Sequence, residues 1–418
     1  MSMIKIPNIL KVYSVLIILV SICVLRILFY KTPPAKQKDF TTNIVITNPI
    51  YIKDSQKVID TAAYKVVSYD LPYCLNKSCS KNLELGDIVK VEGDLYYTTI
   101  YANKITYLKD SALKPLYRIK DILIKTSNQM LTEPYSSLLN GMLFGTEPVV
   151  SDSYKDLLIR AGVIHVIVVS GYNISILFTI MAGLFSRYSI RVKYFLGLIL
   201  VIGYSIVVGF EPPVLRALIM GILAGYGTSY GRVRNPLYIF ISTLLLILIY
   251  SPSLLYSLSF QLTVCATLGI LLLHNKFSIL FNKFLYFKIM PNVLKNDLIS
   301  SICAQLFVIP LIAYYFKKVS LVGFILNPLI LWLIPLIMFI GFILIVYYLI
   351  GLNYLLPFTV ILIKAPLLLF NDVVTFFATI PFGQVEITFS IKDLIVYYFL
   401  AFVFVLIVYK KVKGVNAQ

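Results

Sequence analysis

Apolar runs of about twenty residues recur along this chain of 418 residues, and they constrain its fold more than any other feature. A helix of that length spans the hydrocarbon core of a bilayer, where only helices and closed barrels satisfy their own backbone polar groups. The sequence therefore predicts a polytopic α-helical membrane protein. About ten spans are expected, at residues 8–30, 163–186, 193–210, 214–230, 236–250, 254–274, 298–316, 322–349, 354–370 and 392–410.

One segment does not fit this pattern. Residues 40–112 contain alternating, β-branched and aromatic runs such as "TNIVIT" and "GDIVKVEGDLYY", separated by turn residues. They predict a small OB-like β-barrel of about five strands, although strand number alone does not separate it from an SH3-like barrel. The expected organisation is a membrane anchor and linker at 1–39, the OB-like domain at 40–112, amphipathic interfacial helices at 113–160 and a polytopic domain at 161–418.

The loop charges predict the orientation. With a cytoplasmic N-terminus, most Lys and Arg clusters between spans fall on the inner side, as the positive-inside rule requires. Lys317 and Lys318 fall on the opposite side. Ten spans return the C-terminus to the cytoplasm and leave the OB-like domain outside it. Inner clusters are expected at Arg187, Arg191 and Lys193, at Arg232 and Arg234, at Lys276, Lys283, Lys288 and Lys295, and at Lys410, Lys411 and Lys413.

The five cysteines fall into two groups. Cys23, Cys265 and Cys303 lie in apolar runs, where a free thiol acts as a small apolar group. Cys74 and Cys79 lie in the predicted extracytoplasmic domain, where an oxidising compartment favours a disulfide. We therefore predict a bond between Cys74 and Cys79, with free thiols as the alternative.

The residue inventory excludes several kinds of chemistry. The chain has only two histidines, His165 and His274, so no metal site built on several histidines is expected. No P-loop motif is found, and no cofactor or catalytic residue is predicted. An intramembrane protease pair of His165 and Ser170 is disfavoured, because five residues on one continuous helix separate them by about 140°.

The stretch "GVIHVIVVSGYNISIL" at 162–177 places polar groups in an apolar run. Ser170 and Asn173 lie three residues apart and share a face. Such groups either join helices through hydrogen bonds and close packing, or line a wet cavity. Both interpretations stay open for each residue alone, and the clustering favours a cavity.

Four segments together resemble the ComEC family of competence membrane channels. They are "GVIHVIVVSGYNISIL" at 162–177, "GFEPPVLRALIM" at 209–220, "SPSLLYSLSFQLTVCATLGILLL" at 251–273 and "AQLFVIPLIAYYFKKVSLVGFILNPLI" at 304–330, in the order of that family. The resemblance implies that the chain is a channel rather than an enzyme and passes incoming DNA into the cytoplasm as a single strand. Many relatives have His where this chain has Asn173. Many also carry a metallo-β-lactamase-like nuclease domain, and we expect none within these 418 residues.

The resemblance suggests a role for the segment "FEPPVLRA" at 210–217. A proline at the first helical position, Pro212 or Pro213, leaves backbone N–H groups and a positive helix end near Arg216, as in phosphate sites. The alternative is that Glu211 neutralises this helix end and that Arg216 extends its charge to the membrane interface.

The sequence thus predicts a conduit for single-stranded DNA in the cell membrane. Lys and Arg outnumber Asp and Glu by 37 to 19, which suits a polyanion or anionic lipids. The alternatives are another polytopic transporter or lipid-linked glycan-handling protein with a saccharide-binding OB-like domain, and a scaffold for uptake machinery. Expected partners are single-stranded DNA, membrane lipids and a separate DNA receptor, nuclease and cytoplasmic motor. The predicted DNA path comprises His165, Ser170, Asn173, Arg216, Gln261, Gln305 and Asn327.

Overall fold

The chain divides into two compact units that alternate along the sequence. Unit 1 comprises Met1–Val149, Val169–Arg234 and Ile239–Ser253, and unit 2 comprises Val150–Val168, Asn235–Tyr238 and Leu254–Gln418. The predicted domain boundaries stay a prediction. The structure is a computed structural model that describes residues 6–28, 36–53, 56–61, 64–68, 83–96, 99–146, 150–167, 170–229, 235–282, 291–381 and 383–415.

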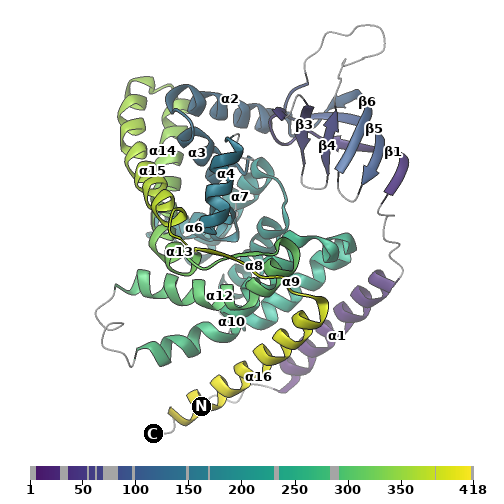
Figure 1. The fold of residues 1–418 in the computed structure, drawn as a ribbon, viewed down its shortest axis with the longest axis vertical. Helices are drawn as coiled ribbons and strands as arrows, with labels where there is room; N and C mark the ends of the chain where they lie inside the picture. Colours follow the sequence, from purple (N-terminus) through teal and green to yellow (C-terminus); the bar gives the residue numbers. More distant parts are fainter. Residues whose placement is uncertain are drawn as a thin grey trace. The chain divides into compact units, whose positions relative to one another are not determined.

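Unit 1 contains a six-stranded sheet with the order β1-β5-β6-β4-β3-β2 (Figure 1). Neighbouring strands are antiparallel, except that β4 and β6 run parallel. Buried and partly exposed residues alternate along β5, as expected for a strand with one face against a core. The strands are β1 (Lys36–Val45), β2 (Tyr51–Lys53), β3 (Gln56–Asp60), β4 (Lys65–Ser68), β5 (Asp87–Tyr96) and β6 (Thr99–Asp110).

The inner face of the sheet forms a core that also includes one helical residue. Tyr117 of α2 (Lys114–Met130) packs into this core, so α2 is joined to the sheet by apolar contact. The predicted disulfide between Cys74 and Cys79 falls outside the described residues. The buried strand and loop residues are Ile44, Ile46, Ile59, Val66, Leu85, Val89, Val91, Leu95, Ile100 and Ile105.

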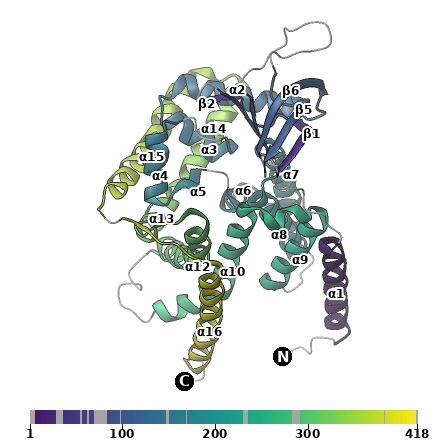
Figure 2. The ribbon, with the colours of Figure 1, turned by 45° about the vertical axis from the view of Figure 1, so that its right-hand side comes forward.

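In unit 1, α6 (Gly171–Leu184), α7 (Ile190–Val208) and α8 (Pro212–Ser229) pack against one another. Figure 2 shows α6, α7, α8 and α9 (Pro236–Tyr250) close together. The first helix, α1 (Ile6–Leu28), contacts α9 where Arg26 Nε donates to the Ile249 carbonyl at 3.3 Å. The short helix α3 (Tyr135–Phe144) follows α2 and also contacts α7.

Unit 2 is built on α10 (Leu258–Phe281), α12 (Asn292–Phe316) and α16 (Ile391–Val415), which pack side by side (Figure 2). Gly269 permits close approach, because a Cβ there would lie 2.3 Å from the Cys303 carbonyl oxygen. The other elements of unit 2 are α4 (Asp152–Ala161), α5 (Ile164–Ile167), β7 (Lys318–Ser320), α13 (Gly323–Leu331), α14 (Leu333–Ile350), α15 (Leu356–Ala378), β8 (Gln384–Glu386) and the 3-10 turn Asn353–Leu355. The 3-10 turn Pro252–Tyr256 begins in unit 1 and ends in unit 2.

Six helical stretches in the described part of the chain are long and apolar enough to cross a membrane. Three shorter apolar helices, at Ile18–Leu28, Gly171–Ile180 and Pro236–Tyr250, accompany them. The chain is therefore a mostly helical, multi-pass membrane protein with a small sheet near its N-terminus. The predicted number of about ten spans stays a prediction. The six are Ile190–Val208, Leu258–Phe281, Leu294–Phe316, Gly323–Tyr348, Leu356–Ala378 and Ile391–Lys410.

One expected span differs in detail. The run at 163–186 is not one continuous helix, because α5 ends at Ile167 and α6 begins only at Gly171. Ser170 lies outside both helices. The predicted angle of about 140° between His165 and Ser170 assumed one continuous helix, and that assumption was wrong.

Candidate functional site

Helices α6 and α8 of unit 1 run in the same direction and begin at the same end. A Cβ at Gly171, the first residue of α6, would lie 3.4 Å from the carbonyl oxygen of Pro213 in the first turn of α8. Further along, a Cβ at Gly221 would lie 2.6 Å from the Phe178 ring. Since helix N-termini carry a partial positive charge, two positive helix ends meet here.

Arg216 lies where these two ends meet. Its Nη2 atom would be only 2.7 Å from a Cβ at Gly171, so the missing side chain leaves room for the guanidinium. Its Nε is buried and has no hydrogen-bond partner among the described residues. A guanidinium and two helix ends all favour an anion, and planar donors suit phosphate oxygens. The arrangement can therefore bind a phosphate group.

Ser170 and Asn173 hold the beginning of α6 in place. Asn173 is 1% exposed, and its Nδ2 donates to the Met142 carbonyl of α3 at 3.0 Å. The Ser170 hydroxyl donates to Asn173 Oδ1 at 3.3 Å. These contacts account for the Asn173 amide through helix packing, which is one of the two interpretations that the sequence left open.

The same hydrogen bonds extend back from α3 to α2. Ser127 Oγ donates to Asn140 Oδ1 at 2.5 Å, and Asn140 Nδ2 donates to Asn128 Oδ1 at 2.8 Å. Because Asn140 and Met142 both belong to α3, polar contacts connect α2 with α3 and α3 with α6. Hydrogen bonds thus connect α6, which lies beside Arg216, to α2, the helix that packs against the sheet.

Lys120 on α2 was not recognised from the sequence as a buried residue. Its side chain is fully buried, and Nζ donates to the Thr47 carbonyl and to Asn48 Oδ1, each at 2.9 Å. Burial lowers the pKa of Lys120 to about 7, although the negative charge of Glu211 acts in the opposite direction. The available signal was its position three residues after Tyr117, on the apolar side of α2.

The other four predicted path residues belong to unit 2. Gln261 Nε2 donates to the Leu255 carbonyl at 3.0 Å, and its Oε1 accepts from the Tyr315 hydroxyl at 3.1 Å. Gln305 Nε2 donates to Ser301 Oγ at 2.9 Å and to the Gly323 carbonyl at 3.2 Å.

Asn327 and His165 complete the set in unit 2. Asn327 is 5% exposed, and its Oδ1 has no partner in the part of the chain that the structure describes. His165 lies on the short helix α5 and is exposed. The structure therefore brings together Ser170, Asn173 and Arg216 in unit 1. A single path lined by all seven residues stays a prediction.

Among the described residues, no group of three or more His, Cys, Asp or Glu side chains is arranged to hold a metal ion. The described cysteines Cys23, Cys265 and Cys303 are free thiols, and Cys23 and Cys303 are buried. The groups at the site around Arg216 are its own guanidinium and the backbone N–H groups of two helix ends, and both kinds of group favour an anion.

Comparison with known proteins gives a family and two relatives. The model of the family described as "Competence protein" matches residues 142–412. The chain is 26% identical over 218 residues to "ComE operon protein 3" of Bacillus subtilis (strain 168), covering 50% of this chain and 26% of that protein. It is 31% identical over 162 residues to an uncharacterized protein of Aquifex aeolicus (strain VF5), covering 38% of each. The aligned part thus spans well under half of either relative. No solved structure matches.

Proposed function

The chain belongs to the competence protein family, and we propose that it is a conduit that passes single-stranded DNA across the cell membrane during natural transformation. The family resemblance predicted from the sequence motifs is confirmed. A multi-pass protein of this family requires a route for a polyanion through a low-dielectric layer. The proposal therefore depends on where the chain can hold phosphate groups.

The observation that carries the proposal is the position of Arg216. A buried guanidinium nitrogen without a partner among the described residues is costly, and a bound anion would offset that cost. Two helix N-termini at the same place add to the field that an anion experiences. A phosphate of a passing strand supplies the required charge and acceptor oxygens without any base-specific contact.

The sheet is proposed to be an OB-type barrel that delivers the strand. Its parallel pair of β4 and β6 and its order β1-β5-β6-β4-β3-β2 support this assignment. Strands β1 and β2 lie at opposite ends of that order, yet only residues 46–50 separate them along the chain. A continuous β1–β2 segment would therefore close the sheet into a barrel. Barrels of the OB type bind oligonucleotides or oligosaccharides.

We also propose that the sheet lies outside the cytoplasm and that both chain ends lie inside. The distribution of Lys and Arg between the apolar runs supports this orientation. In this arrangement the strand would meet the sheet first and Arg216 afterwards. A receptor, a nuclease and a motor would be separate proteins.

A transformation assay on a strain lacking this protein tests the proposal. DNA binding to the cell and arrival of DNA in the cytosol are scored separately. The proposal expects normal binding with loss of arrival, while membrane integrity and envelope composition stay unchanged. Normal arrival would refute the conduit, and altered envelope glycans with normal arrival would favour the glycan-handling alternative.

Thiol accessibility tests the proposed path residues. Single cysteines are placed at Ser170, Asn173 and Gln261 and treated with small water-soluble thiol reagents. Labelling at these positions is expected if they line a wet path. Asn173→Leu is expected to reduce import, with membrane abundance measured alongside. If all three thiols stay unlabelled and Asn173→Leu imports DNA normally, these residues are packing contacts instead.

A further inference from the structure

Two tyrosines are exposed together on the outer face of the sheet. Tyr96 at the end of β5 and Tyr101 near the start of β6 are 37% and 43% exposed. Tyr96 pairs with Thr99, and Tyr101 pairs with Asp94. Residues paired across two strands point to the same side of a sheet, and residues two apart on one strand also share a side. The rings of Tyr96 and Tyr101 are therefore diagonal neighbours on one face.

Among the described residues, the contacts of the two rings leave aromatic surface available. The ring centroids lie 5.6 Å apart at an interplanar angle of 86°, so the edge of one ring meets the face of the other. Lys36, the β1 partner of Tyr96, places Nζ 5.3 Å from the centroid of the Tyr96 ring. Together these contacts occupy at most two of the four ring faces.

The charge of this face indicates which force would hold a ligand there. The register places Glu92 and Asp94 on this face together with four lysines, Lys36, Lys65, Lys90 and Lys104. Lys90 is paired with Glu92 at 2.7 Å. The face therefore carries only a small positive net charge, and attraction between net charges alone would bind a polyanion weakly. Aromatic stacking, with Lys36 next to it, is the stronger available interaction.

We propose that Tyr96 and Tyr101, with Lys36 beside them, form a stacking platform for the unpaired bases of single-stranded DNA. This inference rests on the proposed function and names where the sheet contacts the strand. Every base has an aromatic face, so the platform binds without sequence preference. A duplex hides those faces inside its stack and is therefore bound much less well.

Photocross-linking of the full-length protein in lipid nanodiscs tests the platform without any substitution. The probe is a 15-nucleotide thymidine strand that carries one 5-iododeoxyuridine, and mass spectrometry locates the attachment. Cross-links at Tyr96 or Tyr101 are expected, and unlabelled single strand should suppress them while duplex of equal length should not. Cross-links only at other residues, or equal competition by duplex or by a soluble glycan, would overturn the proposal.

Paired substitutions provide the second test. Tyr96→Ala with Tyr101→Ala should weaken binding of the same strand by roughly tenfold or more, because stacking is lost. Tyr96→Phe with Tyr101→Phe keeps the rings and should bind within about twofold of the native protein. Leu108→Ala is the control, since it removes an exposed apolar side chain from the same strand β6. The salt dependence should be shallow, with a logarithmic slope of roughly 1 to 2.

The outcomes separate this inference from the proposed function. If the double alanine variant binds the strand with unchanged affinity, the proposed stacking platform is refuted. If the deletion strain also fails to import DNA, the proposal that the chain is a DNA conduit still holds. If the alanine pair does not fold, the cross-linking result on the native chain decides. If the native protein binds no single strand and the deletion strain imports DNA normally, the conduit itself is refuted.

Discussion

At the scale of single residues, Lys120 has the most unusual environment. The unfolded chain leaves its amine in water with an ordinary pKa of about 10.4, whereas the folded protein surrounds it with two neutral acceptors. Burial penalises the charged form, and Glu211 offsets only part of this penalty, so the folded-state pKa falls to about 7. Folding is therefore coupled to the loss of a proton.

The sign of this coupling predicts how stability changes with pH. Between pH 7 and the ordinary value, the unfolded chain binds more protons at Lys120 than the folded chain. Stability should rise with pH in this window, by up to about 1.4 kcal/mol per unit, and fall as the pH drops toward 7. Thermal unfolding of the full-length protein in detergent at pH 7, 8 and 9 measures this. Lys120→Met should flatten the dependence, whereas exposed Lys125→Met should keep it. An unchanged slope in Lys120→Met would contradict the account.

Gly171 offers a second residue-scale prediction. A methyl group at this position would lie 2.7 Å from Arg216 Nη2 and 3.3 Å from Ala217 Cβ. The flexible end of Arg216 can move away, and Ala217 needs to shift by only a few tenths of an ångström, so the cost in stability is small. Gly171→Ala should therefore keep membrane abundance but displace the guanidinium, reducing DNA import by about tenfold if one charged hydrogen bond is lost. Gly183→Ala is the matched control, because among the described residues no atom beyond its chain neighbours and its own helix backbone lies within 4 Å of the added methyl. Equal import by both variants would show that the position of Arg216 is unimportant.

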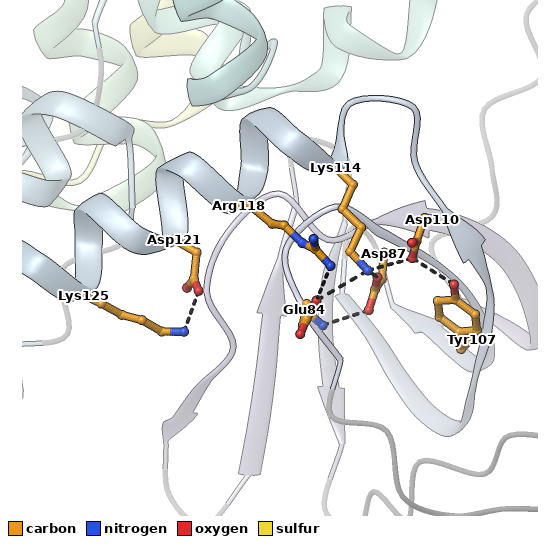
Figure 3. A network of polar contacts seen from close by, with 8 residues as sticks. All are labelled: Glu84, Asp87, Tyr107, Asp110, Lys114, Arg118, Asp121 and Lys125. Carbon is orange, nitrogen blue, oxygen red and sulfur yellow. Dashed lines mark hydrogen bonds and ion pairs between the residues drawn. The ribbon is translucent and has the colours of Figure 1, made fainter. Parts of the chain in front are cut away.

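At the scale of elements, α2 joins the sheet to the helices of unit 1. Figure 3 shows Lys114 at the centre of this junction. Its Nζ lies 2.7 Å from both Asp87 Oδ1 and Asp110 Oδ1, and 3.5 Å from Glu84 Oε2. Burial alone would lower the pKa of Lys114, but hydrogen bonds to Asp110 and Asp87 raise it above its usual range. The buried ammonium thus stays charged and depends on its carboxylates.

Removing one buried carboxylate should therefore weaken the junction. Asp87 is fully buried, and Asp87→Asn keeps its shape but removes the charge that faces Lys114. We expect a loss of about 3 kcal/mol in the stability of the sheet. Pulse proteolysis of the full-length protein across a urea series measures it. Arg118→Gln, which changes an exposed pair 3.8 Å apart, should cost less than about 0.5 kcal/mol. Equal losses in both variants would contradict this role of Asp87.

The same helix shows what sequence could and could not predict. The sequence predicted amphipathic interfacial helices at 113–160, directly after the sheet, but it did not show which of their cations are buried. In the structure Lys120 is buried, while Arg118 and Lys125 are exposed. The Lys120 amine donates hydrogen bonds to Thr47 and Asn48, which lie more than 70 residues away along the chain. Local pattern carries no information about such partners.

A similar distinction applies to the candidate site. The motifs drew attention to Ser170, Asn173 and Arg216 because polar groups in apolar runs are unusual. Their roles depend on tertiary contacts that sequence spacing does not contain, such as the Met142 carbonyl opposite Asn173. The importance of Gly171 as space for Arg216 also became visible only once α6 and α8 were placed together.

At the scale of the whole molecule, the orientation in the membrane can be tested directly. Alkaline phosphatase is active only outside the cytoplasm, and it is fused in turn after Ala112 and after Lys276. We expect activity after Ala112, beyond the last strand of the sheet, and none after Lys276. The excess of Lys and Arg on the inner side is the physical reason. The reverse pattern of activity would place the sheet in the cytoplasm and refute the proposed direction of transport.

The central claim is that Arg216 holds the phosphates of a strand in transit, and a charge series at this position tests it most directly. Cells carrying Arg216→Gln, Arg216→Lys or the exposed control Arg187→Gln are compared for membrane abundance, DNA binding and cytosolic arrival of DNA. The account predicts that Arg216→Gln lowers arrival by about tenfold or more at normal abundance and binding. Arg216→Lys should retain part of the activity because it keeps the charge, and Arg187→Gln should behave as the native protein. Arrival at the native rate in Arg216→Gln would contradict the claim.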